Sequence, residues 1–298
     1  MTVWDSGRSG KPGRLVGPRP PTRTRPAVPE PQPWFAAPVA RPAALLPGLW
    51  QAAYVRIGLT TDDGVRIEAH HDPGPSGLGI VVAHGLTGSG RRPAVRRVAT
   101  ALSAVGGVVS FDFRGHGRSG GLSTVGDLEV RDLAAAVGWA RELGYERIAT
   151  VGFSMGAAVA LRHAAARGEL SAVVAVSGPS RWYYRDTAAM RRVHWLIEKR
   201  LGRLTGRVLR RTRIAPTGWQ PVPEPPDSAA ARIAPIPLLV VHGDADPLFP
   251  VEHAQALYAA AREPKHLWIE PGFGHAENAC TPQLLDRVGS WLARTARA

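Results

Sequence analysis

From about residue 51 onward, continuous apolar segments alternate with amphipathic ones, and this alternation leaves the chain few folds to adopt. A short run of consecutive apolar residues predicts a strand buried on both faces, and apolar residues spaced three or four apart predict a helix. The expected strands span residues 54–59, 65–69, 79–83, 108–113, 148–153, 172–176, 237–242 and 266–270. The expected helices span residues 92–105, 130–143, 155–166, 252–261 and 283–296.

The order of these elements predicts an α/β fold. The first two strands are separated by Asp62, Asp63 and Gly64, a turn signal that predicts a hairpin. The later strands are joined through helices, as parallel strands must be. We therefore expect a mainly parallel, doubly wound sheet with helices on both faces, formed by residues 51–177 and 233–298.

Between the sixth and seventh strands, residues 178–232 are too many for a simple connection and predict an inserted cap, or lid. The cap is rich in basic residues, and its apolar residues have helical spacing from Met190 to Val208. We predict one amphipathic helix there that packs its apolar face on the core and leaves its charged face in solvent. A role at a membrane surface or with an anionic substrate is the alternative.

The net charge of +13 is concentrated in two segments, so it does not describe the whole molecule. Residues 1–50 carry seven Lys or Arg against two acidic residues, and residues 181–213 carry eleven against two. The rest of the chain is close to neutral, which argues against a nucleic-acid-binding domain. We expect contact with anionic membranes, if any, to involve the cap or the tail.

The first 50 residues are dense in Pro, Arg and Gly, and we expect a disordered extension. They lack the apolar stretch of a secretory signal, and no apolar run is long enough to cross a membrane. A single cysteine, Cys280, excludes a disulfide within the chain. These features favour a cytoplasmic protein, with peripheral membrane contact as the alternative.

A pentapeptide from Gly152 to Gly156 matches the pattern G-x-S-x-G, with Ser154 at its centre. An apolar strand precedes it and an Ala-rich helix follows it, which is the strand, turn and helix setting of a nucleophile elbow. The residues two before and two after the serine must be small because the two backbones approach each other there. We predict that Ser154 is a catalytic nucleophile.

A second match to the same pattern, from Gly117 to Gly121 with Ser119 at its centre, shows that the pattern alone is weak. No helical pattern follows it, so no helix N-terminus would stabilise an alkoxide there. The same stretch matches G-x-G-x-x-G, but Asp132 lies in a helical pattern rather than at the end of a second strand. We therefore reject both Ser119 as nucleophile and a dinucleotide site.

A serine nucleophile needs a base, and the base needs a carboxylate that orients it. His275 follows the last expected strand, and Asp244 and Asp246 follow the strand before it. We predict His275 as the general base and Asp246 as the orienting acid, with Asp244 as the alternative acid. No set of histidines has metal-ligand spacing with supporting carboxylates, so we predict no metal and no cofactor.

These motifs, together with residues 84–88 and 112–119, resemble α/β-hydrolase fold serine hydrolases of the monoacylglycerol lipase and serine aminopeptidase type. The resemblance covers roughly residues 54–296. It implies that the backbone amides of Leu86 and Met155 form the oxyanion hole and that Arg114 and His116 are structural organisers. The tail and the cap have no counterpart that would identify a substrate.

The predicted reaction is hydrolysis of a small-molecule carboxylic ester through an acyl-enzyme on Ser154. A thioesterase, an amidase or peptidase, and an acyltransferase use the same residues and remain alternatives. A non-catalytic binding protein on a hydrolase scaffold is the alternative of another class. The aromatic residues of the cap favour an apolar or aromatic acyl group; they are Trp182, Tyr183, Tyr184 and Trp195.

Overall fold

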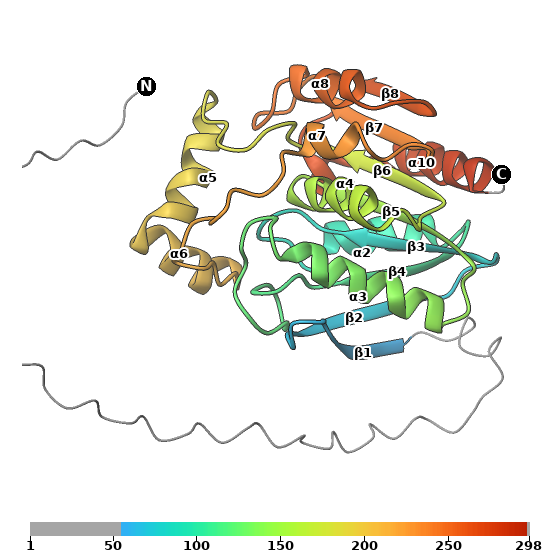
Figure 1. Ribbon diagram of the computed structural model, residues 1–298, viewed down its shortest axis with the longest axis horizontal. Coiled ribbons are helices and arrows are strands. Elements are labelled where there is room, and N and C mark those ends of the chain that lie inside the picture. Colours follow the sequence, from blue (N-terminus) through green and yellow to red (C-terminus); the bar gives the residue numbers. More distant parts are fainter. Residues whose placement is uncertain (1–54, 297–298) are drawn as a thin grey trace, which may run out of the picture. The chain divides into compact units, whose positions relative to one another are not determined.

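The computed structural model describes residues 55–296, so the extension predicted for residues 1–50 lies outside the described residues. An eight-stranded sheet forms the centre, in the order β1-β2-β4-β3-β5-β6-β7-β8 (Figure 1). Its strands are β1 (Val55–Thr60), β2 (Arg66–Asp72), β3 (Leu78–Ala83), β4 (Gly107–Phe111), β5 (Arg147–Phe153), β6 (Ala172–Val176), β7 (Leu238–Gly243) and β8 (Lys265–Glu270).

The pairing of the strands confirms the mainly parallel, doubly wound sheet. The hairpin β1–β2 is antiparallel, with Val55 opposite His71, and β2 also runs antiparallel to β4. All the other neighbours, from β4 through β3 to β8, are parallel. The chain passes from β3 to β4 on one side and then returns to β5 on the other. This reversal creates a crevice at the carboxyl ends of the strands, where α/β folds place their sites.

Helices cover both faces of the sheet (Figure 1). Apolar side chains of one face pack with α3 (Glu129–Glu142), α4 (Met155–Arg167), α7 (Pro226–Ala230) and α8 (Glu252–Ala260). Those of the opposite face pack with α2 (Pro93–Leu102), α9 (Ala276–Ala279) and α10 (Pro282–Thr295). Because central strands such as β3 and β6 are buried at every residue, both faces contribute to the core. No helix among residues 55–296 is both long and apolar enough to cross a bilayer.

The cap contains two helices where one was predicted: α5 (Ala188–Glu198) and α6 (Arg200–Arg210). The helical run breaks at Lys199, whose backbone is extended. Gly202 explains why α6 can fold back on α5, since a Cβ there would lie 2.2 Å from the carbonyl oxygen of Trp195. The residues on each side of Lys199 are helical, as their spacing predicted, but they form two helices, so the single-helix prediction was wrong.

The direction in which the cap helices face also differs from the prediction. Met190 of α5 packs with Tyr184 and Phe249, as an inward apolar face should. In α6, however, the buried residues are Gly202 and Gly206, while the leucines and the valine are exposed. α7 lies within the range predicted as cap, yet its two alanines pack in the core, and the boundaries of the cap stay a prediction.

Candidate active site

Ser154 occupies a sharp turn between β5 and α4, with φ 52° and ψ −115°. A non-glycine residue rarely adopts positive φ, and the surrounding structure must hold it there. The turn is tight on both sides: a Cβ at Gly152 would lie 2.3 Å from the carbonyl oxygen of Gly156, and one at Gly156 would lie 2.2 Å from that of Ala83. The two glycines therefore allow the approach that the sequence pattern requires.

His275 and Asp246 come together from the loops that follow β8 and β7. The Nδ1 atom of His275 lies 2.7 Å from Oδ2 of Asp246, whose side chain is fully buried. The other carboxylate oxygen accepts hydrogen bonds from the amides of Leu248 (2.8 Å) and Phe249 (3.1 Å). Burial opposes ionisation of Asp246, but these hydrogen bonds outweigh it and lower the pKa of the carboxyl.

The alternative acid, Asp244, has a different position. It is exposed, and its Oδ1 accepts a hydrogen bond of 2.7 Å from the amide of Gly272. Asp244 thus links the loop after β7 to the loop after β8. Of the two aspartates, Asp246 is the one paired with His275.

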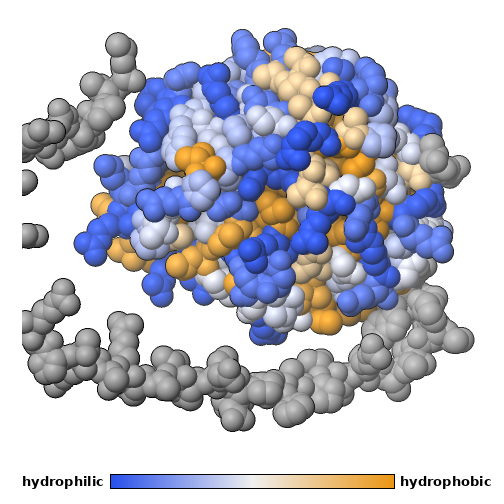
Figure 2. Space-filling view, viewed as in Figure 1, coloured by the Kyte–Doolittle hydropathy of each residue, from blue (hydrophilic) through white to orange (hydrophobic). Residues whose placement is uncertain are grey.

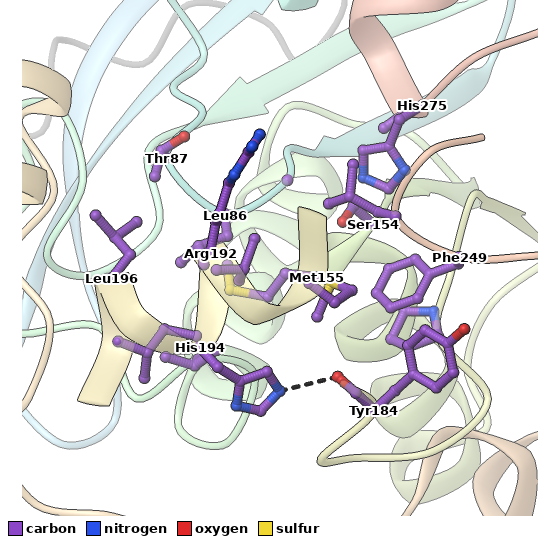
Figure 3. Close-up of a pocket in the computed structure, with 18 of the residues that line it drawn as sticks. Leu86, Thr87, Ser154, Met155, Tyr184, Arg192, His194, Leu196, Phe249 and His275 are labelled. Carbon is purple, nitrogen blue, oxygen red and sulfur yellow. Dashed lines mark hydrogen bonds between the residues drawn. The ribbon is translucent and has the colours of Figure 1, made fainter. Parts of the chain in front are cut away.

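A cavity of about 690 Å³ lies between the carboxyl ends of the strands and the cap. Ser154, His275, Leu86 and Met155 all line it, and Figure 3 shows Ser154 beside His275. The cap contributes aromatic walls to the same cavity, namely Trp182, Tyr183, Tyr184, Trp195 and Trp219. Four of the five predicted site residues therefore line one space, and the fifth, Asp246, is buried and bonded to His275.

The two predicted oxyanion donors lie in segments that leave amides free of helical partners. Met155 is the first residue of α4, where the first amides of a helix have no acceptor within the helix. Leu86 lies in a turn that is closed by a hydrogen bond of 2.9 Å from the amide of Gly88 to the carbonyl of Gly85. Their catalytic role stays a prediction.

Two buried histidines support this turn. Nε2 of His84 accepts from the amide of Phe113 (3.1 Å), and Nε2 of His116 accepts from the amide of Thr87 (3.2 Å). An amide can only donate, so both imidazoles are unprotonated at Nε2. Burial lowers the pKa of each histidine to about 4, which keeps the rings neutral. His116 thus has the structural role that the resemblance implied.

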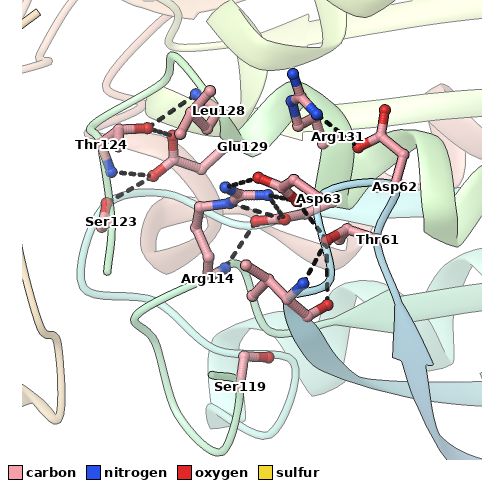
Figure 4. Close-up of polar contacts among 12 residues, drawn as sticks. Thr61, Asp62, Asp63, Arg114, Ser119, Ser123, Thr124, Leu128, Glu129 and Arg131 are labelled. Carbon is pink, nitrogen blue, oxygen red and sulfur yellow. Dashed lines mark hydrogen bonds and ion pairs between the residues drawn. The ribbon is translucent and has the colours of Figure 1, made fainter. Parts of the chain in front are cut away.

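Arg114 forms the centre of a polar cluster (Figure 4). Its guanidinium donates to Asp63 at 2.8 Å and 3.0 Å and to Asp132 at 2.8 Å and 2.9 Å. Burial opposes its charge, but the hydrogen bonds that it donates to these carboxylates raise the pKa of Arg114. Because Asp63 follows β1 and Asp132 lies in α3, Arg114 joins the hairpin to the helix layer.

Glu129 anchors a loop of the cavity wall and was missed in the sequence. Its buried carboxylate accepts from Ser123 Oγ, from Thr124 Oγ1 and from three amides, all between 2.7 Å and 3.1 Å (Figure 4). The loop carries Val125, which lines the cavity. Nothing in the spacing of Glu129 within α3 indicates this function, because the contacts come from the loop's folded path.

Ser119, the serine of the second pentapeptide, is buried away from this cavity. Its Oγ donates to the carbonyl of Asp112 (2.5 Å) and accepts from the amide of Glu68 (2.9 Å). Both bonding directions of the hydroxyl are thus taken up by backbone groups. This geometry ties the hairpin to the loop after β4 and agrees with the rejection of Ser119 as nucleophile.

Glu277 is a second residue that the sequence interpretation missed. It lines the cavity, is almost fully buried, and accepts a hydrogen bond of 3.2 Å from the amide of Gly85 through Oε1. Burial raises the pKa of its carboxyl. The one sign of Glu277 in the sequence was its position two residues after His275, because its partner Gly85 is far away along the chain.

Among residues 55–296, no group of three His, Cys, Asp or Glu side chains is arranged for a metal, and the no-metal expectation stays a prediction.

The sequence model of the alpha/beta hydrolase family matches residues 80–284 of this chain. With the sheet order and the serine turn described above, this match shows that the chain belongs to that family. The chain is therefore a hydrolase with the α/β-hydrolase fold.

Particular relatives extend the comparison. The uncharacterized protein Rv2307c of Mycobacterium tuberculosis is 32% identical over 260 residues, covering 84% of this chain and 79% of its own. A monoacylglycerol lipase of Mycolicibacterium smegmatis is also 32% identical, covering 74% and 89%. The solved structure of the Pyrococcus furiosus esterase Pf2001 is 27% identical, covering 85% and 97%, with a TM-score of 0.66.

Proposed function

We propose that this chain is a serine hydrolase that cleaves a carboxylic ester through an acyl-enzyme on Ser154. One observation carries the proposal: His275, hydrogen-bonded to the buried Asp246, lines the same cavity as a serine held at positive φ. A nucleophile, an orienting acid and a base, which follow each other along this chain as Ser154, Asp246 and His275, are the elements that acyl transfer needs.

In the proposed reaction, Nε2 of His275 takes the hydroxyl proton of Ser154 while Oγ attacks the ester carbonyl. The amides of Leu86 and Met155 bind the oxyanion that forms, and Asp246 stabilises the imidazolium. The tetrahedral intermediate collapses as His275 gives its proton to the leaving alcohol. Water, deprotonated by His275, then attacks the acyl-enzyme and releases the acid and the free serine.

The walls of the cavity favour an apolar acyl group. Aromatic and aliphatic side chains, from the cap and from the core, line most of it, and apolar contacts of this kind bind hydrocarbon through the hydrophobic effect. The esterase and the monoacylglycerol lipase among the similar proteins support an ester substrate. Thioesters, amides and acyl transfer to another alcohol would use the same catalytic residues.

The experiment measures hydrolysis of p-nitrophenyl esters from acetate to palmitate by the wild type and by Ser154→Ala. We expect the variant to lose at least about a thousandfold in kcat/KM, because the covalent step is removed. The chain-length optimum of the wild type reports the acyl group that fits. Ser119→Ala, the serine of the other pentapeptide, is the matched control, with its folding checked by thermal melting.

A fluorophosphonate probe separates the remaining outcomes, since it labels an activated serine irrespective of substrate. Labelling of the wild type and of Ser119→Ala, but not of Ser154→Ala, supports the serine mechanism even where these esters are poor substrates. Equal ester hydrolysis by wild type and Ser154→Ala contradicts it. A wild type that neither hydrolyses nor reacts with the probe favours a binding protein.

A further inference from the structure

Helix α6 presents its side chains in three separate arcs. At 100° per residue, Gly202 and Gly206 share one arc, and both are buried. The neighbouring arc is apolar and exposed: Leu201, Leu204, Val208 and Leu209 keep 65%, 54%, 67% and 71% of their surface accessible. The third arc consists of arginines. The side of α6 that faces the protein is therefore made of glycine, and the apolar side faces outward.

The charge around this apolar arc has a single sign. Residues 199–213 contain seven Lys or Arg and no acidic residue. Within the described part of the chain, none of the α6 arginines forms an ion pair with a carboxylate; they are Arg200, Arg203, Arg207 and Arg210. Arg203 instead donates to the carbonyls of Ile197 and Glu198 at the end of α5. Apolar side chains and cations without a carboxylate partner among the described residues thus lie side by side on one exposed helix.

This surface borders the mouth of the cavity. Leu209 and Arg210 of α6 line the cavity together with Ser154, as do Trp195 and Arg192 of α5. In Figure 1, α5 and α6 lie together at one side of the sheet, and Figure 2 shows hydrophobic and hydrophilic residues intermixed over them. A partner that covers α6 would therefore also meet the entrance to the site.

We propose that α6 is a docking helix for the surface of an anionic lipid bilayer. Its apolar arc would enter the boundary between headgroups and acyl chains, and its arginines would bind lipid phosphates. Both components of such a surface, apolar and negative, complement the two exposed arcs of the helix. A second copy of this chain fits less well, because pairing two such helices would bring their arginines together without counter-charges.

The docking inference does not depend on the hydrolysis proposed above. Binding is measured with the full chain carrying Ser154→Ala, so that no lipid is consumed. A failure of catalysis and a failure of docking are then distinguished, because the first concerns Ser154 and the second concerns α6.

The experiment is co-sedimentation of the full chain with vesicles of phosphatidylcholine alone and with vesicles that contain phosphatidylglycerol, at low and at high salt. Binding to the anionic vesicles that weakens with salt is expected. Charge reversal by Arg200→Glu and Arg207→Glu together is expected to weaken binding by at least about thirtyfold, since each arginine contributes about fivefold near an anionic surface. Leu204→Ser with Val208→Ser tests the apolar arc in the same way.

Matched controls make the same changes elsewhere on the surface. Arg97→Glu with Arg262→Glu alters the net charge equally, and Ile57→Ser with Leu122→Ser removes two other exposed apolar side chains. The controls are expected to bind as the parent does. The proposal is overturned if the α6 variants bind like the controls, if phosphatidylcholine binds equally well, or if the α6 variants instead dissociate an oligomer in light scattering.

Discussion

Asp244 and Asp246 differ by two positions in the chain, and this difference decides which carboxylate can act with His275. Asp246 is buried against the imidazole, whereas Asp244 is exposed and bonded to the amide of Gly272. We expect Asp246→Asn to lower kcat by about a thousandfold to ten-thousandfold, because an amide no longer selects the imidazole tautomer that accepts the serine proton.

Asp244→Asn is the matched comparison, and we expect it to keep kcat within about threefold, since its side chain contacts a loop amide only. Steady-state kinetics on the best p-nitrophenyl ester check both variants. If Asp244→Asn shows the larger loss, the assignment of the orienting acid is wrong.

Glu277 acts through the backbone of Gly85, next to the predicted oxyanion donor Leu86. Truncation by Glu277→Ala leaves the Gly85 amide without this acceptor and frees the turn, so we expect kcat to fall by about tenfold or more with little change in KM. Glu277→Gln keeps an acceptor oxygen and nearly the same volume, and it should recover most of the activity. Equal losses in both variants would show that the charge, rather than the hydrogen bond, is what matters.

At the scale of secondary structure, two glycines of α6 offer the same substitution in different surroundings. A Cβ at Gly202 meets the carbonyl oxygen of Trp195 at 2.2 Å, whereas the nearest atom to a Cβ at Gly206 is 3.5 Å away. Gly202→Ala should therefore separate α6 from α5, and Gly206→Ala should stabilise the helix by up to about 1 kcal/mol.

Limited trypsin digestion measures this difference, since the cap is rich in arginine. Faster cleavage in the cap is expected for Gly202→Ala and slower cleavage for Gly206→Ala. Equal rates for the two variants would mean that the contact between α5 and α6 does not limit opening of the cap.

The elements that the sequence predicted well are those whose environment is uniform. β3 and β6 are apolar throughout because both faces are covered, and the elbow requires glycine at two spaced positions. The cap was predicted poorly for a physical reason. Periodicity assumes that the apolar arc is the buried one, but the buried residues of α6 are glycines, and Gly202 allows close approach of the α5 backbone.

The site residues also divide into those that the sequence predicted and those that it did not. Ser154, Asp246 and His275 occupy turns directly after strands, where parallel topology brings distant loops together. Glu129 and Glu277 act on backbone amides of loops, and no spacing in the sequence shows which amides will lie near them. Such residues are found only when the folded path of the loop is known.

For the whole molecule, buried histidines dominate the expected response to acid. Burial lowers the pKa to about 4 in each of four histidines, His84, His116, His163 and His253. In the unfolded chain they titrate near 6.5, so between these values the unfolded state binds more protons and the stability falls as the pH is lowered. Two buried carboxyls with raised pKa values, Asp132 and Glu277, oppose this in part.

The melting temperature measured between pH 7 and pH 4 checks this balance. We expect it to fall steadily below about pH 6.5, with a net uptake of about two protons on unfolding. His163 lies in α4 outside the cavity, and His163→Gln should reduce the proton uptake on unfolding by about one. A melting temperature that is constant or rises on acidification would contradict the predicted sign.

The cap leaves and rejoins the core at almost one point. The carbonyl of Ser180 accepts a hydrogen bond of 3.0 Å from the amide of Asp227, and the indole of Trp182 donates to the carbonyl of Pro223 at 2.9 Å. An insertion whose ends meet can be exchanged for another of different length without altering the order of the strands. On the proposed function, a changed cap would alter the part of the cavity that it lines, while Ser154, Asp246 and His275 keep their places in the core.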